Sequence, residues 1–140
     1  DLLEIEITEN MMMENMDVII PMLKAFKARK VGISVDDFGT GYSSFAYLKA
    51  LPVDTLKIDR SFIKDLHINK DDIHIVQAII NMAHKMGLKV VAEGVEEQLH
   101  CQKLCSVGCD VVQGYYISRP EEAEMLQDIL DVAYISHLAI

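Results

Sequence analysis

The feature of this sequence that most restricts its fold is an alternation of short apolar segments with longer amphipathic ones. The short segments have the length and β-branched content of strands, and they span residues 2–7, 31–36, 55–59, 89–93 and 110–115. The longer segments predict helices near residues 12–29, 43–50, 71–86, 97–107 and 121–134. Strand–helix–strand units of this length imply parallel pairing with right-handed crossovers. An open doubly wound sheet and a (β/α) barrel both fit this pattern, and periodicity does not choose between them.

Size and charge narrow the possible functions. The chain has 140 residues, of which 51% are hydrophobic, so we expect one folded core rather than two domains or a disordered segment. The formal net charge of −9 argues against binding a DNA or RNA polymer, which requires a basic surface. A small phosphorylated substrate remains possible if divalent metals supply positive charge.

The location follows from segments that the sequence lacks. No stretch approaches the roughly 18 apolar residues of a membrane span, and no secretion signal opens the chain. We therefore expect a cytoplasmic domain, whose parent protein could still be anchored through another region. Because the first residues already resemble a strand, we also expect the chain to be part of a longer protein.

The cysteines and histidines give no clear metal pattern. The three cysteines are Cys101, Cys105 and Cys109. They could form a metal or redox cluster, but small apolar residues in a reducing compartment are the simpler interpretation. The histidines are scattered, and we interpret them as surface or helix residues: His67, His74, His84, His100 and His137.

Polar side chains gather at the carboxyl ends of the predicted strands. Four of the five strands end on a carboxylate or an amide, namely Glu6, Asp36, Glu93 and Gln113. The remaining strand carries Lys57 and Asp59. The carboxyl ends of parallel strands share one rim, where barrel enzymes and open α/β sheets keep their ligand sites. A single polar residue there is usually the start of a solvated loop, but the recurrence on every strand favours a site.

The carboxylates at this rim need a counter-charge. Asp36 and Asp37 are adjacent, and both can turn toward one point where the strand breaks. Two carboxylates about 4 Å apart repel by roughly 4 kcal/mol at an effective dielectric near 20. Oxygen ligands of this kind favour Mg²⁺, Mn²⁺ or Ca²⁺. Lys57 either forms a structural ion pair here or holds an attacking water or an anionic oxygen.

The aspartate pair is followed by a glycine-containing loop, Phe38, Gly39, Thr40 and Gly41. Two glycines so close together indicate unusual backbone angles or close approach to a ligand. This lone Gly-x-Gly lacks the further residues of a dinucleotide-binding or P-loop motif, so it does not support nucleotide binding of those kinds.

Four longer motifs resemble one known family. They are LEIEITEN at 3–10, SVDDFGTGYSSFAYLKALPVDTLKIDRSFI at 34–63, KVVAEGVE at 89–96 and GCDVVQGYYISRP at 108–120. In order and spacing they resemble the downstream signature blocks of the EAL domain family. The resemblance implies a TIM-like (β/α) barrel of EAL type, here an incomplete barrel of about five β/α units. It also implies hydrolysis of the bacterial second messenger cyclic di-GMP to linear pGpG with two Mg²⁺ or Mn²⁺ ions.

The resemblance assigns roles by position. The family's metal ligands match Glu6, Asp36, Asp37 and Glu93. Lys57 matches the lysine that orients the hydrolytic water, and Gln113 matches the glutamine that completes the water and metal network. Glu9 matches the glutamate that steadies the loop at 38–44, which in the family also couples the site to homodimerisation. Asp59 lies in the same block as Lys57, as a possible further site residue.

Part of the family pattern lies outside this sequence. The family opens with a Glu-Ala-Leu motif whose glutamate binds metal, and an asparagine ligand follows it; neither is among these residues. We therefore expect residues 1–140 to be the C-terminal portion of a single EAL domain, inactive by themselves. Three functions remain open for the parent: an active phosphodiesterase, a sensor that binds cyclic di-GMP without cleaving it, and a protein-interaction module. A GGDEF or sensory domain could lie upstream.

Overall fold

The computed structural model describes residues 3–14, 16–41, 45–122 and 125. They form one sheet of five strands: β1 (Glu4–Thr8), β2 (Gly32–Phe38), β3 (Thr55–Ile58), β4 (Lys89–Ala92) and β5 (Val111–Val112). Each strand pairs in parallel with the next one along the chain, so the spatial order is β1-β2-β3-β4-β5. A doubly wound sheet reverses its strand order at a switch point, whereas a barrel adds strands in sequence. The unbroken order identifies the barrel-type arrangement, here as an incomplete barrel.

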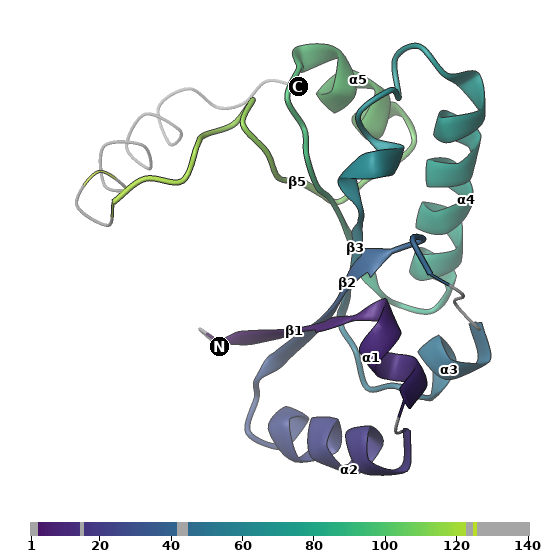
Figure 1. The fold of residues 1–140 in the computed structure, drawn as a ribbon, viewed down its shortest axis with the longest axis vertical. Helices are drawn as coiled ribbons and strands as arrows, with labels where there is room; N and C mark the ends of the chain where they lie inside the picture. The colour runs from purple at the N-terminus through teal and green to yellow at the C-terminus, as the bar shows by residue number, and fades with distance from the viewer. Residues whose placement is uncertain (1–2, 15, 42–44, 123–124, 126–140) are drawn as a thin grey trace.

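Helices connect the strands and cover the sheet (Figure 1). They are α1 (Glu9–Glu14), α2 (Met16–Lys27), α3 (Phe45–Ala50), α4 (Lys70–Lys85) and α5 (Gln98–Ser106), with a 3-10 turn η1 (Arg60–Phe62) directly after β3. Among the described residues, none of these helices is both long and apolar enough to cross a membrane.

The core lies between the sheet and the helices. All four residues of β3, the central strand of the sheet, are buried. On α4, Val76, Ile80 and Ala83 recur at the spacing of one helical face and are almost completely buried. The apolar strand residues Ile33, Val35, Leu56 and Val90 are fully buried in the same cluster.

The ends of α4 illustrate why its predicted extent was nearly right. Asn69 caps the helix, since its side chain accepts a hydrogen bond from the Asp71 amide. Gly87 follows the last turn with φ +76°, the left-handed conformation that ends many helices. Both signals are local, so they can be recognised in the sequence.

The prediction of a single helix at residues 12–29 was wrong. Helix α1 begins at Glu9, directly after β1, where the Thr8 hydroxyl accepts a hydrogen bond from the Met11 amide at 3.4 Å. A second helix, α2, begins at Met16. The run of methionines continues the apolar periodicity across this junction, so the sequence pattern alone shows no break.

Two other predictions concern the C-terminal end of the chain. The strand expected at 110–115 comprises only Val111–Val112. The amide of Gln113 still donates a hydrogen bond to the Ala92 carbonyl of β4. The carbonyl of Gln113, however, accepts a hydrogen bond from the amide of Val95, which lies in a loop, so the regular pairing ends here. Of the helix expected at 121–134, almost every residue lies outside the part of the chain that the structure describes.

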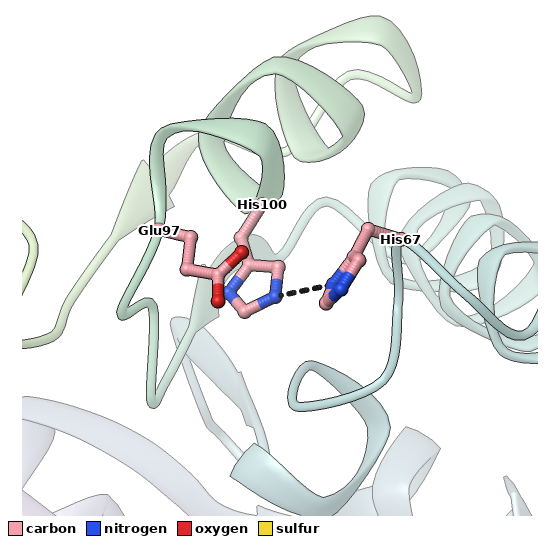
Figure 2. A group of neighbouring side chains, drawn as sticks. All are labelled: His67, Glu97 and His100. Atoms are coloured by element: carbon pink, nitrogen blue, oxygen red, sulfur yellow. Dashed lines mark hydrogen bonds between the residues drawn. The ribbon is translucent and has the colours of Figure 1, made fainter.

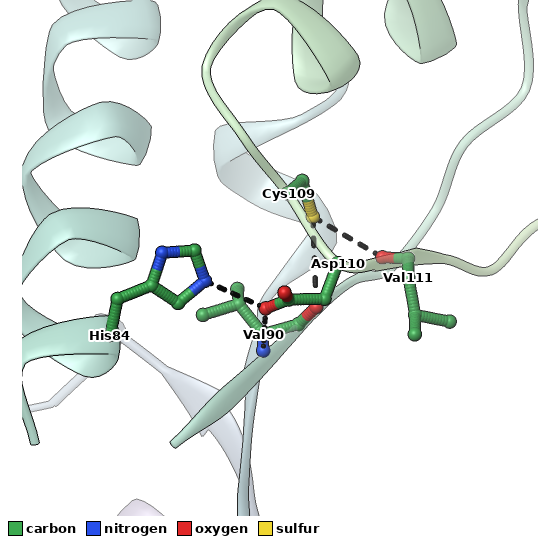
Figure 3. A network of polar contacts seen from close by, with 5 residues as sticks. All are labelled: His84, Val90, Cys109, Asp110 and Val111. Carbon is green, nitrogen blue, oxygen red and sulfur yellow. Dashed lines mark hydrogen bonds and ion pairs between the residues drawn. The ribbon is translucent and has the colours of Figure 1, made fainter. Parts of the chain in front are cut away.

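Two aspartates fasten the amino-terminal end of the sheet. Asp54 accepts a hydrogen bond from the Ile33 amide at 3.0 Å and pairs with Lys27 at 2.6 Å. Asp110 makes the same kinds of contact two strands further along the chain, accepting a hydrogen bond from the Val90 amide at 2.8 Å and contacting His84 at 2.8 Å (Figure 3). Each aspartate precedes a strand, bonds the neighbouring strand and contacts the helix that leads into that neighbouring strand, so the arrangement repeats. We call this end of the sheet the base, and the opposite end the rim.

Candidate active site at the carboxyl ends of the strands

Lys57 is the centre of the rim. It is only 6% exposed, and its Nζ lies 2.6 Å from Glu6 Oε1, 2.7 Å from Glu93 Oε1 and 3.3 Å from Asp36 Oδ1. These three carboxylates come from β1, β2 and the residue after β4, while the lysine comes from β3. The parallel register therefore brings together four residues that lie far apart in the sequence, as the strand-end pattern predicts.

The carboxylates keep Lys57 charged. Burial alone would lower the pKa of Lys57, but the hydrogen bonds to Glu6 and Glu93 and the charges of Glu93 and Asp36 raise it far above its ordinary value. The side chain is therefore an ammonium at neutral pH, which donates hydrogen bonds and has no lone pair with which to accept a proton.

The rim still carries more negative than positive charge. Three carboxylates surround one ammonium. Moreover, Asp36 Oδ1 is buried and, although near Lys57, makes no hydrogen bond. A buried carboxylate oxygen without a donor is energetically unfavourable, and a cation at this point would satisfy it.

A bulge separates the two adjacent aspartates. The pairing of β2 with β3 shifts between Val35 and Phe38, and Asp37 adopts the left-handed region at φ 54°. Asp36 thus faces Lys57, while Asp37 is exposed and lines a neighbouring cleft of about 340 Å³. Glu93 contacts Lys57 and also lines this cleft, so it joins the two halves of the rim.

The cleft contains two further predicted residues, Asp59 and Gln113. Its lining also includes Gly94 and Gly114. At Gly94 a side chain would meet Arg60, and at Gly114 it would meet the backbone of Val95, so glycine permits close approach at both positions. Asp59 also has a structural role, because its carboxylate caps η1 by accepting a hydrogen bond from the Ser61 amide at 3.0 Å.

Glu9 contacts the loop that follows the aspartates. It is 2% exposed, and its Oε2 accepts hydrogen bonds from the amides of Gly39 at 2.9 Å and Gly41 at 3.3 Å. Gly39 has φ +100°, and a side chain there would strike the ring of Phe62. Phe38 is buried, and the Thr40 hydroxyl donates to the Asp37 carbonyl. The described part of the loop, residues 38–41, is therefore held by one buried carboxylate.

Comparison with known families identifies this arrangement. The family model described as "EAL domain" matches residues 1–120. The chain belongs to the EAL domain family. The resemblance of the sequence motifs and the barrel-type order of the strands are thereby confirmed.

Relatives of this EAL chain are named for cyclic di-GMP. This chain is 51% identical over 128 residues to the cyclic di-GMP phosphodiesterase NbdA of Pseudomonas aeruginosa. The aligned region covers 91% of this chain and 16% of NbdA. The structure of the PaMucR phosphodiesterase in complex with c-di-GMP matches 89% of this chain and 50% of its own, with 47% identity and a TM-score of 0.84. A manganese/cy-diGMP complex of Klebsiella pneumoniae BlrP1 matches 84% of this chain and 30% of its own, with 35% identity and a TM-score of 0.78.

A cavity larger than the rim cleft lies at the other end of the sheet. It has a volume of about 1030 Å³ and lies at the base, where Lys27, Lys30 and Lys89 contribute to its lining. The base aspartate Asp54 also lines it but is engaged by Lys27 and the backbone. Cavity size therefore points to the base, whereas the surplus of carboxylates and the unpaired Asp36 Oδ1 point to the rim.

Partial burial of Cys101 and Cys109 disfavours redox chemistry at these two of the three cysteines. Burial raises the pKa of the Cys101 thiol, and it is also the main cause that raises the pKa of Cys109 to about 11. A thiol with a raised pKa contains little of the reactive thiolate at neutral pH. Cys109 instead contacts the carbonyls of Val90 and Val111.

Two histidines meet in a way that the sequence does not predict. His100 is buried, at 3% exposure, and its Nε2 lies 3.1 Å from Nδ1 of His67 (Figure 2). With Glu97 they form a group of three side chains whose potential ligand atoms all lie within 4.8 Å of one another. The Glu-x-x-His spacing of residues 97–100 is a signal that could have found two members, but nothing local marks His67.

Proposed function

We propose that this EAL chain carries part of the active site of a cyclic di-GMP phosphodiesterase, which hydrolyses one phosphodiester bond of cyclic di-GMP to give linear pGpG. The observation that carries the proposal is the group of Glu6, Asp36 and Glu93 around buried Lys57 at the rim of an EAL-type sheet. NbdA and PaMucR, which are about half identical to this chain, bear the phosphodiesterase name. The chain spans only 16% of NbdA and 50% of the PaMucR structure, so the activity is proposed for the complete protein.

The rim carboxylates fit divalent metal ions. Glu6, Asp36, Asp37 and Glu93 would hold them: their donor atoms are oxygens only, and Asp36 Oδ1 is buried without a donor. Mg²⁺ or Mn²⁺ at these carboxylates would activate water and stabilise charge on the phosphate and the leaving oxygen. We expect Ca²⁺ to bind but to inhibit, because its looser coordination positions the reactants less well.

Lys57 is assigned the task of orientation. As an ammonium it donates hydrogen bonds, so it can hold the attacking water or a phosphate oxygen in place without removing a proton. Gln113 lines the rim cleft beside Glu93, and its amide can both donate hydrogen bonds to the water and substrate and accept them. Asp59 is a further candidate there, in addition to its capping role.

Glu9 is proposed to position the loop rather than to touch the substrate. Its two hydrogen bonds fix the amides of Gly39 and Gly41 next to the aspartate pair. A fixed loop keeps Asp37 in its left-handed conformation and thereby in the cleft. We propose that the same loop transmits homodimerisation of the parent protein to the site.

The surrounding architecture is also a proposal. We propose that residues 1–140 are the C-terminal portion of one EAL domain, with a GGDEF or sensory domain upstream. The acidic composition supports a dinucleotide rather than a DNA or RNA polymer as partner. The three free cysteines suit the reducing cytoplasm, where the site would meet its substrate.

The test is hydrolysis by the complete protein. Purified protein with Mn²⁺ should convert cyclic di-GMP to pGpG, and Lys57→Ala should lower kcat by about 10²-fold or more with little change in dinucleotide binding. Lys49→Ala is the matched control, because Lys49 is an exposed lysine outside the rim. Binding without any hydrolysis would instead assign the protein as a sensor, and an absence of binding would leave protein interaction as its role.

A further inference from the structure

A second cavity lies beside the rim cleft, between the segment after η1 and the start of α5. Its volume is about 590 Å³, and His67, Glu97 and His100 contribute to its lining. Arg60, Gly94 and Glu96 border both this cavity and the rim cleft, yet none of the carboxylates proposed as rim metal ligands lines the cavity. Whatever binds here is therefore held by a different set of side chains.

The two imidazoles meet at the spacing of metal ligands. His67 Nδ1 and His100 Nε2 are 3.1 Å apart, and the ring planes are inclined by 39°, so the rings are not stacked (Figure 2). Two nitrogens bound to one tetrahedral zinc at about 2.0–2.1 Å would be separated by about 3.3 Å. A small movement of either ring would thus admit an ion between the nitrogens and Glu97.

The histidine pair leaves one nitrogen unsatisfied. His100 is 3% exposed, and its Nδ1 is buried without a hydrogen-bond partner. A hydrogen bond to His67 accounts for only one of its two nitrogens, and a buried unpaired nitrogen is unfavourable. In metal-bound histidines, the N–H of the second ring nitrogen usually donates a hydrogen bond to a carboxylate or another acceptor.

Glu97 is free to take part. It occupies the N-cap position of α5, but its side chain makes no capping hydrogen bond. It precedes His100, which lies in the first turn of α5, by three residues. The carboxylate is exposed, and it faces the imidazole of His100 in Figure 2.

We propose that His67, Glu97 and His100 form a binding site for a transition metal of the Zn²⁺ class. Two imidazoles and one carboxylate are a ligand set that zinc accepts, with the fourth position left to water from the cavity. Mg²⁺ and Ca²⁺ prefer oxygen ligands and would select the rim instead. Asp65 and Glu96 on the cavity wall offset the charges of Arg60 and Lys64, so the site can accept a cation.

The test is zinc binding by the complete protein, measured by competition with a chromophoric chelator in millimolar Mg²⁺. Wild-type protein should bind one Zn²⁺. The affinity of Glu97→Gln and of His67→Ala for Zn²⁺ should be lower by at least about tenfold. His74→Ala is the matched control and should equal the wild type, because His74 is an exposed histidine of α4 outside the cavity. Co²⁺ bound at the same site should give a visible spectrum that the two variants lose.

The variants are chosen to keep the fold. Glu97 is exposed and His67 is half-buried, so neither substitution removes a core residue, and circular dichroism should match the wild type. Zinc bound adventitiously at the rim carboxylates would be equal in wild type and variants. Equal zinc affinity and stoichiometry in wild type, Glu97→Gln and His67→Ala would overturn the proposal.

Discussion

The base and the rim of the same parallel sheet differ in how their carboxylates are paired with basic side chains. At the base, Asp54 and Asp110 each meet one basic side chain, Lys27 or His84, and each also accepts a backbone hydrogen bond. At the rim, three carboxylates share the single ammonium of Lys57. The base is locally balanced, whereas the rim is not.

This difference separates stability from chemistry. Each base aspartate ties two strands and a helix together, which is a complete structural role. The rim, by contrast, buries Lys57 and leaves Asp36 Oδ1 without a hydrogen bond, which weakens the fold unless a ligand binds. In barrel enzymes the carboxyl ends of strands carry the reaction and the opposite face carries stability. The charges of this EAL chain follow that division.

The largest expected effect is the removal of metal from the complete protein. Treatment with EDTA should reduce cyclic di-GMP hydrolysis to background, and added Mn²⁺ or Mg²⁺ should restore it, because the surplus rim carboxylates require a cation. Ca²⁺ should not restore turnover. The contacts at the base of the sheet, such as that of Asp54 with Lys27, use no metal. The far-ultraviolet circular dichroism spectrum of the protein should therefore change little on treatment with EDTA. Full hydrolysis in chelator would refute the metal-dependent mechanism.

A paired substitution should divide rim from base. Lys57→Ala should lower turnover by about 10²-fold or more, while Asp54→Asn should leave turnover nearly unchanged. Asp54→Asn should instead lower the free energy of unfolding by about 1–2 kcal/mol, through weaker hydrogen bonds to Ile33 and Lys27. Both properties are measured on the same two purified variants, by kinetics and by urea denaturation. Near-normal turnover of Lys57→Ala would reduce the lysine to a structural ion-pair partner.

The sequence predicts the rim better than its surroundings because strand ends are local signals. Glu6, Asp36, Lys57 and Glu93 follow apolar runs, and parallel pairing is enough to bring them together. The division of Asp36 from Asp37 depends on a bulge, which requires knowledge of the register with β3. The partnership of His67 with His100 joins residues 33 positions apart from a loop and a helix, so no periodicity reveals it.

The glycines provide a smaller test of the same contrast. Gly114→Ala at the rim would force a side chain into the backbone of Val95, which cannot move aside easily. We expect a loss of roughly 1–3 kcal/mol in unfolding free energy, together with lower turnover because Gln113 precedes this position. Gly32→Ala at the base meets only the flexible side chain of Glu4, at 3.3 Å, and should be milder. Thermal denaturation of both variants checks the order, and equal losses would argue against a tighter rim.

The smallest effect concerns the pH dependence of the base. Burial alone would raise the pKa of Asp110, but the hydrogen bonds from His84 and from the Val90 amide, with the charges of His84 and Lys89, lower it below its ordinary value. A carboxyl group with a lowered folded-state pKa stabilises the fold above its unfolded value, about 3.9, and this contribution is lost as the pH falls through the folded value. Because the side chain is 36% exposed, solvent screens the pair, and Asp110→Asn should cost no more than about 1 kcal/mol at pH 7. The difference from wild type should shrink toward zero in acid, where Asp110 is itself protonated.

Asp65→Asn is the control, since Asp65 is exposed and its carboxylate makes no hydrogen bond among the described residues. Urea denaturation of wild type and variants at pH 7 and pH 3 makes the comparison. If the stability difference between wild type and Asp110→Asn is the same at both pH values, the charge of Asp110 does not fasten β4 to β5.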